Sequence, residues 1–176
     1  MKPPSAHLLR TLASVPVNSR ILDLGCGHGN QTQALVRLGF EVFACDAERK
    51  AVHAARHRIA ELRGDADLDR RIRRCMLNAI DFPDASFDWV VAHQPAAYVD
   101  GQDDLAQLLA EARRLLKPGA WVFVAVRDRV VPTPEALAAA AQASNLAEAE
   151  TPVTVAEHGE PLVRGIYRRV EAGTPA

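Results

Sequence analysis

Apolar residues along this chain recur with two alternating periods. Short apolar runs of strand length occupy residues 20–24, 41–45, 87–92 and 120–126, and a weaker strand candidate lies at 72–77. Segments with apolar residues at helical spacing cover about 31–38, 47–62, 105–116 and 134–143. Strands that alternate with helices in this way predict a single α/β domain with a doubly wound, mostly parallel sheet.

Both ends of the chain carry further predicted elements. Ser5 can cap a short helix that runs to about Ala13, so residues 1–19 form an N-terminal helix and its lead-in. Val153 and Val155 alternate with threonine, and a Gly/Pro turn leads from them into an apolar run at 162–170, which predicts an antiparallel hairpin. We expect the domain to span residues 1–176, with 171–176 as a loose tail.

Composition places the chain among ordinary globular proteins. Hydrophobic residues make up 48% and charged residues 24% of the 176 residues, and the formal net charge is −1, so no global charge favours nucleic acid or a membrane surface. The seven arginines between positions 56 and 74 alternate with acidic residues and indicate a solvated surface. The three cysteines have no C-x-x-C spacing, so we expect buried reduced thiols, no metal site and a cytoplasmic protein. The N-terminus has no apolar region of the length of a signal peptide.

The candidate chemistry follows the first strand. Asp23 stands within the apolar run, and Gly25, Gly27 and Gly29 come directly after it at alternate positions. Glycines let the backbone turn sharply and let a ligand lie against the main chain. In a doubly wound sheet, ligands bind outside the carboxyl ends of the strands. The residues expected at those ends are 23–29, Asp46, Asn78, Ala79, His93 and Gln94.

Two ligands compete for this glycine turn. A dinucleotide-binding turn has the pattern G-x-G-x-x-G and holds a pyrophosphate at the helix N-terminus. Here Gly29 comes one residue too early, and Asn30 stands where that pattern has its third glycine. Asp23 would place a carboxylate beside the pyrophosphate. S-adenosylmethionine carries no phosphate but a sulfonium and an ammonium, so the spacing and the carboxylate favour this cofactor.

Three segments together resemble the class I S-adenosylmethionine-dependent methyltransferases. Residues 21–29 (ILDLGCGHG) are similar to the first motif of that family, and Asp46 matches the acidic residue that ends its second strand. Residues 82–88 (FPDASFD) resemble the loop into its fourth strand, and residues 112–119 (ARRLLKPG) its R-x-L-K-P-G-G segment. The resemblance implies a Rossmann-like, seven-stranded sheet whose last strand is antiparallel.

The same resemblance implies where the cofactor lies. Asp23 and the segment Gly25, Cys26, Gly27, His28 and Gly29 would face the methionine part, and Asp46 with Ala47 would face the ribose. Asn78 and Ala79 fall where the family usually has Asp-Ala near the adenine, with Asp81 as the second candidate for that contact. An asparagine side chain can both donate and accept hydrogen bonds at an adenine edge.

No catalytic residue is evident, and His93 is the one candidate. It ends the fourth predicted strand and is a candidate cofactor contact, and its imidazole could accept a proton from an acceptor; packing over the cofactor is the competing interpretation. Residues 93–96 (HQPA) do not match the (N/D)-P-P-(Y/F) pattern of family members that methylate base or glutamine amino groups. We therefore expect methyl transfer to a small molecule, without a metal. Non-catalytic binding of the cofactor and a nicotinamide-dependent oxidoreductase are the alternatives, and the oligomeric state stays open.

Overall fold

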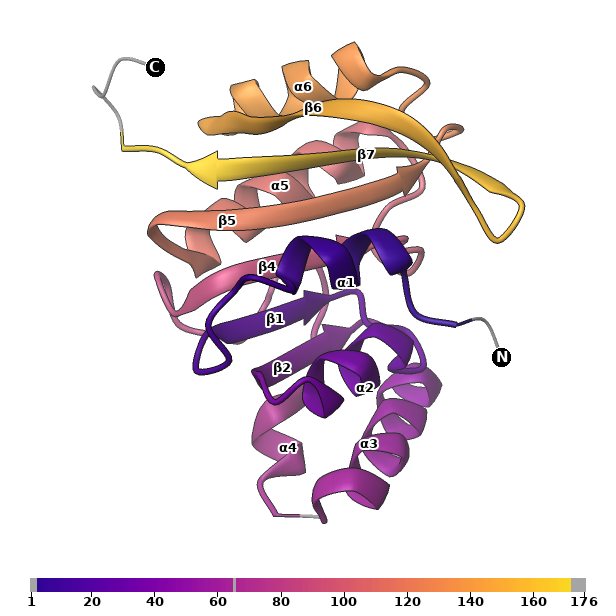
Figure 1. Cartoon of the computed structure of the whole chain (residues 1–176), viewed down its shortest axis with the longest axis vertical. Helices are drawn as coiled ribbons and strands as arrows, with labels where there is room; N and C mark the ends of the chain where they lie inside the picture. Colours follow the sequence, from indigo (N-terminus) through magenta and orange to yellow (C-terminus); the bar gives the residue numbers. More distant parts are fainter. Residues whose placement is uncertain (1–2, 65, 172–176) are drawn as a thin grey trace.

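A seven-stranded sheet forms the centre of the protein, which a computed structural model describes over residues 3–64 and 66–171 (Figure 1). In chain order the strands are β1 (Arg20–Leu24), β2 (Glu41–Asp46), β3 (Ile72–Arg74), β4 (Phe87–His93), β5 (Leu116–Arg127), β6 (Leu146–Glu157) and β7 (Glu160–Arg169). Their spatial order is β3-β2-β1-β4-β5-β7-β6. The first five pair in parallel, whereas β7 runs antiparallel to both of its neighbours. The predicted fold class, with its antiparallel last strand, is confirmed.

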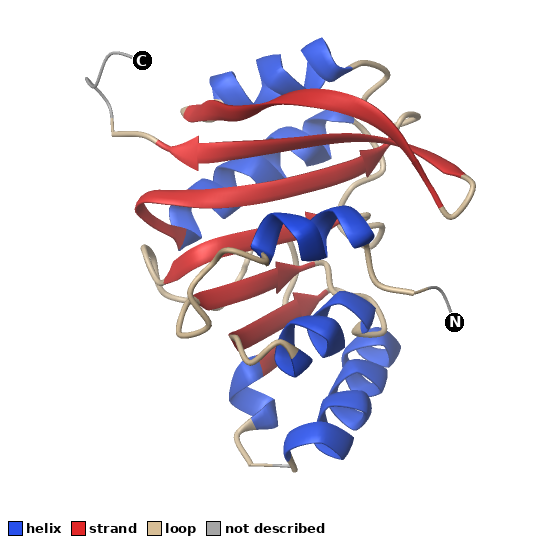
Figure 2. Cartoon of the chain, viewed as in Figure 1, coloured by secondary structure: helices blue, strands red, loops and turns tan. Residues whose placement is uncertain are grey.

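Helices cover both faces of the sheet. They are α1 (Ala6–Leu12), α2 (Asn30–Arg37), α3 (Arg49–Arg63), α4 (Leu68–Arg71), α5 (Gln102–Leu115) and α6 (Pro134–Ala143). In the view of Figure 2, α1 and α2 lie in front of the sheet and α5 and α6 behind it. The predicted cap of the first helix is present, since the Ser5 hydroxyl accepts the Leu8 N–H at 3.3 Å.

Each face of the sheet has its own apolar core. Behind the sheet, Leu108 and Leu109 of α5 pack with Phe87 and Val124. In front, Leu8 and Leu12 of α1 and Leu35 of α2 pack with residues such as Ile21 and Phe123. Strands buried on both faces explain the nearly continuous apolar runs seen in the sequence. The three cysteines are free and buried, as expected.

Two strand boundaries and one short helix differ from the sequence-based expectation. The strand expected at 72–77 ends at Arg74, because the chain then enters a tight turn in which the Ala79 N–H donates to the Met76 carbonyl at 2.9 Å. The strand expected from Ala120 already begins at Leu116, which pairs with Phe87 of β4. The short helix α4 was not predicted, and Leu68 is its one buried residue, too little apolar pattern to indicate a helix.

The C-terminal hairpin is longer than predicted and reaches the edge of the sheet where β1 and β5 end (Figure 1). The pairing of β6 with β7 shifts register between Glu148 and Glu150 and again before Val153. Such shifts bend a strand and increase its twist. The bend brings the hairpin turn toward the start of α1. Apart from Glu171, the predicted loose tail lies outside the described residues. Within residues 3–64 and 66–171, no helix is long and apolar enough to cross a membrane.

Candidate functional site

The glycine turn between β1 and α2 is held by hydrogen bonds to the end of β2. The N–H groups of Gly25 and Cys26 both donate to the Cys45 carbonyl, at 2.9 and 3.0 Å. The Gly27 N–H donates to the Asp46 carboxylate at 2.9 Å, and the Gly29 N–H donates to the Cys26 carbonyl at 3.0 Å. These four N–H groups are therefore already satisfied within the protein, and a phosphate would have to displace their partners.

The three glycines of the turn have different surroundings. All three have positive φ, between 52° and 82°. A Cβ on Gly25 would lie 2.4 Å from Pro95 Cβ, and one on Gly29 would lie 3.0 Å from Ala55. A Cβ on Gly27 would meet no described atom within 4 Å. Gly25 and Gly29 thus allow close packing, whereas Gly27 presents bare backbone to open space where a ligand can lie.

An open cleft of about 170 Å³ lies along this turn. Six of the residues predicted at the strand ends line it: Gly25, Cys26, Gly27, His28, His93 and Gln94. The remaining lining residues are Pro3, Asn30, Gln31 and His158. The cleft therefore combines the turn, the first residues of α2, the end of β4, the N-terminal segment and the hairpin turn.

Two buried carboxylates stand next to the cleft. Asp23 is 1% exposed and accepts the Thr32 hydroxyl proton at 2.6 Å, and burial raises the pKa of its carboxyl to about 6. Asp46 is 2% exposed, and it accepts the Glu48 N–H at 2.9 Å in addition to that of Gly27. Burial and the charges of both carboxylates raise the pKa of the Cys26 thiol. The electrostatic environment of the glycine turn is therefore negative.

The residues predicted on the ribose and adenine side lie apart from this cleft. Asn78 and Ala79 are exposed in the turn that follows β3, and neither lines the cleft. The Ala47 carbonyl accepts a hydrogen bond from Arg74 Nε at 3.0 Å. Asp81 is exposed and pairs with Arg73 at 3.1 Å. In this conformation, the predicted residues thus form two groups, one at the cleft and one around the ends of β2 and β3.

His93 is held by groups from two other elements. Its Nε2 lies 2.7 Å from Glu157 Oε2 at the end of β6, and its Nδ1 lies 3.2 Å from the Gln31 side-chain nitrogen. The side chains of His93 and Glu157 are each 7% exposed. The hydrogen bond from His93 lowers the pKa of Glu157 to about 2, against the opposing effect of burial. Ser5 completes the arrangement, because its backbone N–H donates to Gln31 Oε1 at 3.0 Å.

Sequence reasoning missed Gln31, Glu157 and His158 as site residues. Gln31 lies in the first turn of the helix that follows the glycine turn, and this position next to the turn could have identified it as a site residue. The other two lie at the hairpin turn, and β6 runs parallel to β5 because both are antiparallel to β7. This topology takes the end of β6 to the edge where β4 ends, but the pairing of Glu157 with His93 depends on the bends in β6.

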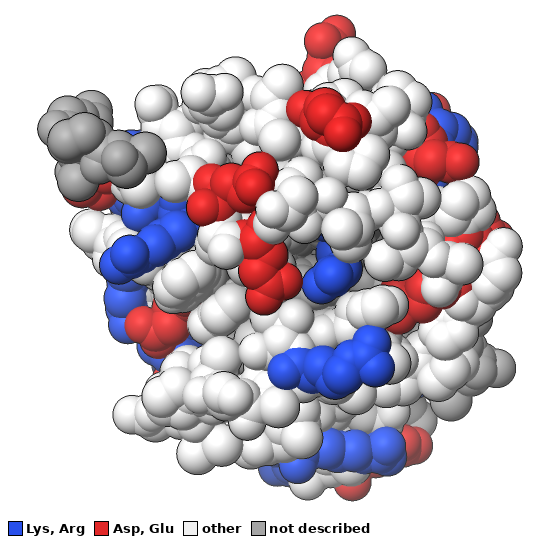
Figure 3. All heavy atoms as spheres, turned by 45° about the horizontal axis from the view of Figure 1, so that its top comes forward, with Lys and Arg blue, Asp and Glu red and all other residues white. Residues whose placement is uncertain are grey.

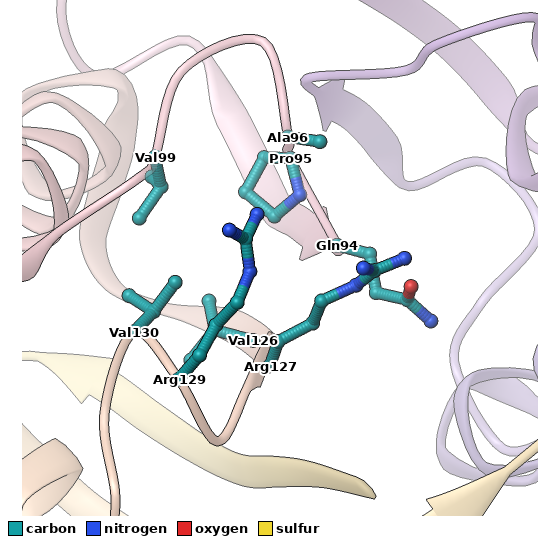
Figure 4. Close-up of a pocket in the computed structure, with 8 residues that line it drawn as sticks. All are labelled: Gln94, Pro95, Ala96, Val99, Val126, Arg127, Arg129 and Val130. Atoms are coloured by element: carbon teal, nitrogen blue, oxygen red, sulfur yellow. The ribbon is translucent and has the colours of Figure 1, made fainter. Parts of the chain in front are cut away.

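A second, narrow cleft of about 20 Å³ adjoins the first through Gln94, which lines both. Figure 4 shows its walls, which come from the loop after β4 and from the end of β5 with the loop that follows. Its apolar lining residues are Pro95, Ala96, Val99, Val126 and Val130. Arg127 and Arg129 extend along it, and they pair with Glu160 at 3.9 Å and with Asp100 at 3.2 Å. A ligand in this cleft would contact apolar side chains, and the two arginines lie at its rim.

Comparisons with known proteins show which family the chain belongs to. Residues 22–124 match a family model described as a methyltransferase domain. The chain is 36% identical over 122 residues to a ubiquinone biosynthesis O-methyltransferase of Xanthomonas campestris pv. campestris, an alignment that covers 69% of this chain and 47% of that protein. The chain thus spans about half the length of the curated relatives it matches.

Solved structures show the same fold. An S-adenosylmethionine-dependent methyltransferase from Methanosarcina mazei superposes with a TM-score of 0.75 at 16% identity, covering 95% of this chain and 99% of that one. A 1,6-didemethyltoxoflavin-N1-methyltransferase from Burkholderia thailandensis, solved with S-adenosylhomocysteine, gives 0.73 at 19% identity, covering 94% and 76%. The family match favours S-adenosylmethionine over a dinucleotide as the cofactor. The chain belongs to the methyltransferase domain family.

Proposed function

We propose that the protein is an S-adenosylmethionine-dependent methyltransferase that acts on a small molecule. The observation that carries the proposal is the pair of buried carboxylates beside the glycine turn, one of which already occupies the Gly27 N–H. Negative charge at this place stabilises a sulfonium and an ammonium and opposes a pyrophosphate. Membership of the methyltransferase domain family supports the same cofactor.

The proposed cofactor contacts follow from the two groups of predicted residues. The methionine part would lie along the bare backbone of Gly27, between Cys26, His28 and His93, with the charge of Asp23 behind the turn. Asp46 would accept the ribose hydroxyls, since a carboxylate has about four lone-pair sites and two of those of Asp46 are used by backbone N–H groups. The adenine would lie toward Ala47 and the turn after β3. That turn holds Asn78, Ala79 and, a little further on, Asp81.

The acceptor would enter through the second cleft, which meets the cofactor cleft at Gln94. When bound, S-adenosylmethionine supplies a methyl group on a good leaving group, so the chain mainly has to place an acceptor atom in line with it. The apolar walls of this cleft suit an apolar group, and its volume of about 20 Å³ has room for about one water molecule, so the cleft would have to widen to admit a whole acceptor. Basic and acidic side chains share the face seen in Figure 3, and neither sign covers it, which gives no support for a nucleic acid substrate.

The names of the curated relatives add one further detail to the proposal. They are ubiquinone biosynthesis O-methyltransferases, which supports an oxygen atom as the acceptor. We also propose a cytoplasmic location, supported by three free, buried cysteines.

Labelled methyl transfer tests the proposed function. The purified protein is incubated with methyl-labelled S-adenosylmethionine and a small-molecule extract, and label is measured in the small-molecule, protein and nucleic acid fractions. We expect label in small molecules alone. Binding of S-adenosylhomocysteine without any transfer would favour a non-catalytic cofactor-binding protein. Binding of NAD without binding of S-adenosylhomocysteine would identify a nicotinamide-dependent enzyme instead.

A further inference from the structure

A series of hydrogen bonds connects the N-terminal helix to the hairpin along one wall of the cofactor cleft. The Ser5 N–H donates to Gln31 Oε1 at 3.0 Å, Gln31 Nε2 lies 3.2 Å from His93 Nδ1, and His93 Nε2 lies 2.7 Å from Glu157 Oε2. The four residues belong to the start of α1, to α2, to β4 and to β6. These hydrogen bonds therefore join segments that are far apart in the sequence.

The groups at the two ends of this hydrogen-bond series, the Ser5 N–H and the Glu157 carboxylate, determine the direction of every hydrogen bond in it. A backbone N–H can only donate, so the Gln31 oxygen faces Ser5 and its NH₂ group faces His93. An ionised carboxylate can only accept, so His93 Nε2 carries the proton that binds Glu157. In the neutral imidazole, Nδ1 then holds the lone pair, which accepts from the Gln31 amide. Ser5 and Glu157 thus select one tautomer of His93.

From this arrangement we propose that Glu157 is a positioning residue that holds His93 as the Nε2–H tautomer, so that His93 Nδ1 takes the proton of an acceptor hydroxyl group. The inference rests on the proposed methyltransferase function with an oxygen acceptor, and it names the residue that takes the acceptor's proton. His93 and Gln31 both line the cleft, so the contact between His93 Nδ1 and the Gln31 amide lies at its wall. An acceptor hydroxyl that displaces the Gln31 amide would donate to the same lone pair.

The chemistry of the acceptor explains why a proton acceptor matters here. A neutral amine attacks with a lone pair that is already free, whereas a hydroxyl becomes a good nucleophile as it loses its proton. The hydroxyl proton moves to His93 Nδ1 while the oxygen gains the methyl group, and the sulfur leaving group keeps the electron pair of the broken bond. The resulting imidazolium is stabilised by the Glu157 carboxylate, 2.7 Å away.

Other ionisable groups interact with this pair from several elements. Asp23 of β1 acts on His93, and His7 of α1 and His158 of the hairpin turn act on Glu157. The second carboxylate oxygen of Glu157, Oε1, is buried, and hydrogen bonds from His93 and from the Ser5 side chain lower the pKa of Glu157. These donors keep the buried carboxylate ionised beside His93. Glu157 is therefore suited to stabilise the imidazolium.

Nuclear magnetic resonance of isotope-labelled histidine tests the tautomer without any acceptor. The His93 signals are assigned by their loss in His93→Gln, and spectra are recorded with S-adenosylhomocysteine bound. We expect Nε2 protonated and Nδ1 unprotonated in the wild type and in the control Glu150→Gln, which changes an exposed glutamate of the same strand. In Glu157→Gln the preference for one tautomer should disappear. A proton on Nδ1 in the wild type would overturn the proposal.

Methyl transfer to paired probe acceptors tests the role of the tautomer. We expect kcat for transfer to catechol to be about 100-fold lower in Glu157→Gln with unchanged KM for S-adenosylmethionine, and any transfer to 1,2-diaminobenzene to be unaffected, because a neutral amine needs no proton acceptor. The lost activity should return in part at alkaline pH, where catechol ionises unaided. A merely structural role would leave the shape of this pH profile unchanged, and that result would overturn the proposal.

Two further outcomes separate the inference from the function it rests on. Transfer to the diamine that falls as much as transfer to catechol in Glu157→Gln would refute the proton-acceptor role of His93 while leaving methyltransferase activity in place. Protein that binds no S-adenosylhomocysteine would refute the proposed function itself. Thermal unfolding of each variant shows whether it is folded, and Glu157→Asp serves as a second variant that keeps the charge.

Discussion

Asp23→Asn changes the charge beside the glycine turn with almost no change of shape. An asparagine oxygen can still accept the Thr32 hydroxyl proton, which Asp23 accepts at 2.6 Å. The carboxylate is 1% exposed and burial raises its pKa from 3.8 to about 6, so the folded protein carries an unfavourable charge at neutral pH. We therefore expect the variant to be more stable than the wild type at neutral pH and to bind the cofactor more weakly.

The magnitude follows from the shift in pKa. A rise of about two units corresponds to about 3 kcal/mol at a pH above both values. For a domain of this size, that difference raises Tm by roughly 6–12 °C. Because the folded pKa lies above the unfolded one, the cost is full above about pH 6 and fades as Asp23 becomes protonated in the fold, reaching zero below about pH 4. Loss of the charge should weaken binding of S-adenosylmethionine, which carries a sulfonium and an ammonium, on the order of tenfold.

Denaturant unfolding of both proteins at about pH 7.5 and about pH 4.5 measures this difference. Asp88→Asn is the matched control of opposite sign, since Asp88 pairs with Lys117 at 2.7 Å and accepts the Arg20 N–H at 2.9 Å. Burial opposes these partners, yet they hold the pKa of Asp88 below its usual value, so this variant should be less stable at neutral pH. A stability difference for Asp23→Asn that does not change with pH would refute the electrostatic reasoning.

Further variants probe the turn and the pair at the hairpin. Gly25→Ala should strongly destabilise the fold, because its Cβ would collide with Pro95. Gly27→Ala should lower the free energy of unfolding by only about 1 kcal/mol, because of its positive φ, and should abolish S-adenosylhomocysteine binding. Equal losses of stability in thermal melts of the two variants, or unchanged binding by Gly27→Ala in a titration, would contradict this. Asp46→Ala should lower the free energy of unfolding by about 2–4 kcal/mol through two lost backbone hydrogen bonds, and unchanged cofactor affinity would limit Asp46 to supporting the turn. For Glu157, whose folded pKa of about 2 lies below the unfolded 4.5, stability is present above about pH 4.5 and falls toward pH 2; Glu157→Gln should remove this acid sensitivity, and an unaltered pH dependence of unfolding would argue against it.

The fold and the glycine turn could be predicted because their signals are local in the sequence. The apolar run of β1, Asp23 and the spacing of three glycines lie within ten residues, and each glycine has the positive φ that a tight turn requires. The alternation of strands with helices then limits the topology to a few choices. The antiparallel hairpin followed from two apolar runs joined by a short turn.

The partners within the site could not be predicted in the same way. Glu157 lies 64 residues from His93 in the chain, and their contact depends on two register shifts in β6 that no sequence pattern marks. Asp46 was predicted from its place at the end of β2, but its hydrogen bond to Gly27 depends on the path of the turn. The adenine contacts of Asn78, Ala79 and Asp81 stay predictions. Strand β3 ends at Arg74, so these three residues lie in an exposed loop whose partners within the protein do not define an adenine site.

The central claim is that the cleft beside Gly27 binds an adenosyl amino acid cofactor, which carries no phosphate. Calorimetric titration of the purified protein with S-adenosylhomocysteine and, separately, with NAD tests it most directly. We predict one-site binding of S-adenosylhomocysteine, lost in Gly27→Ala, and no binding of NAD. Binding of NAD with none of S-adenosylhomocysteine would contradict the claim.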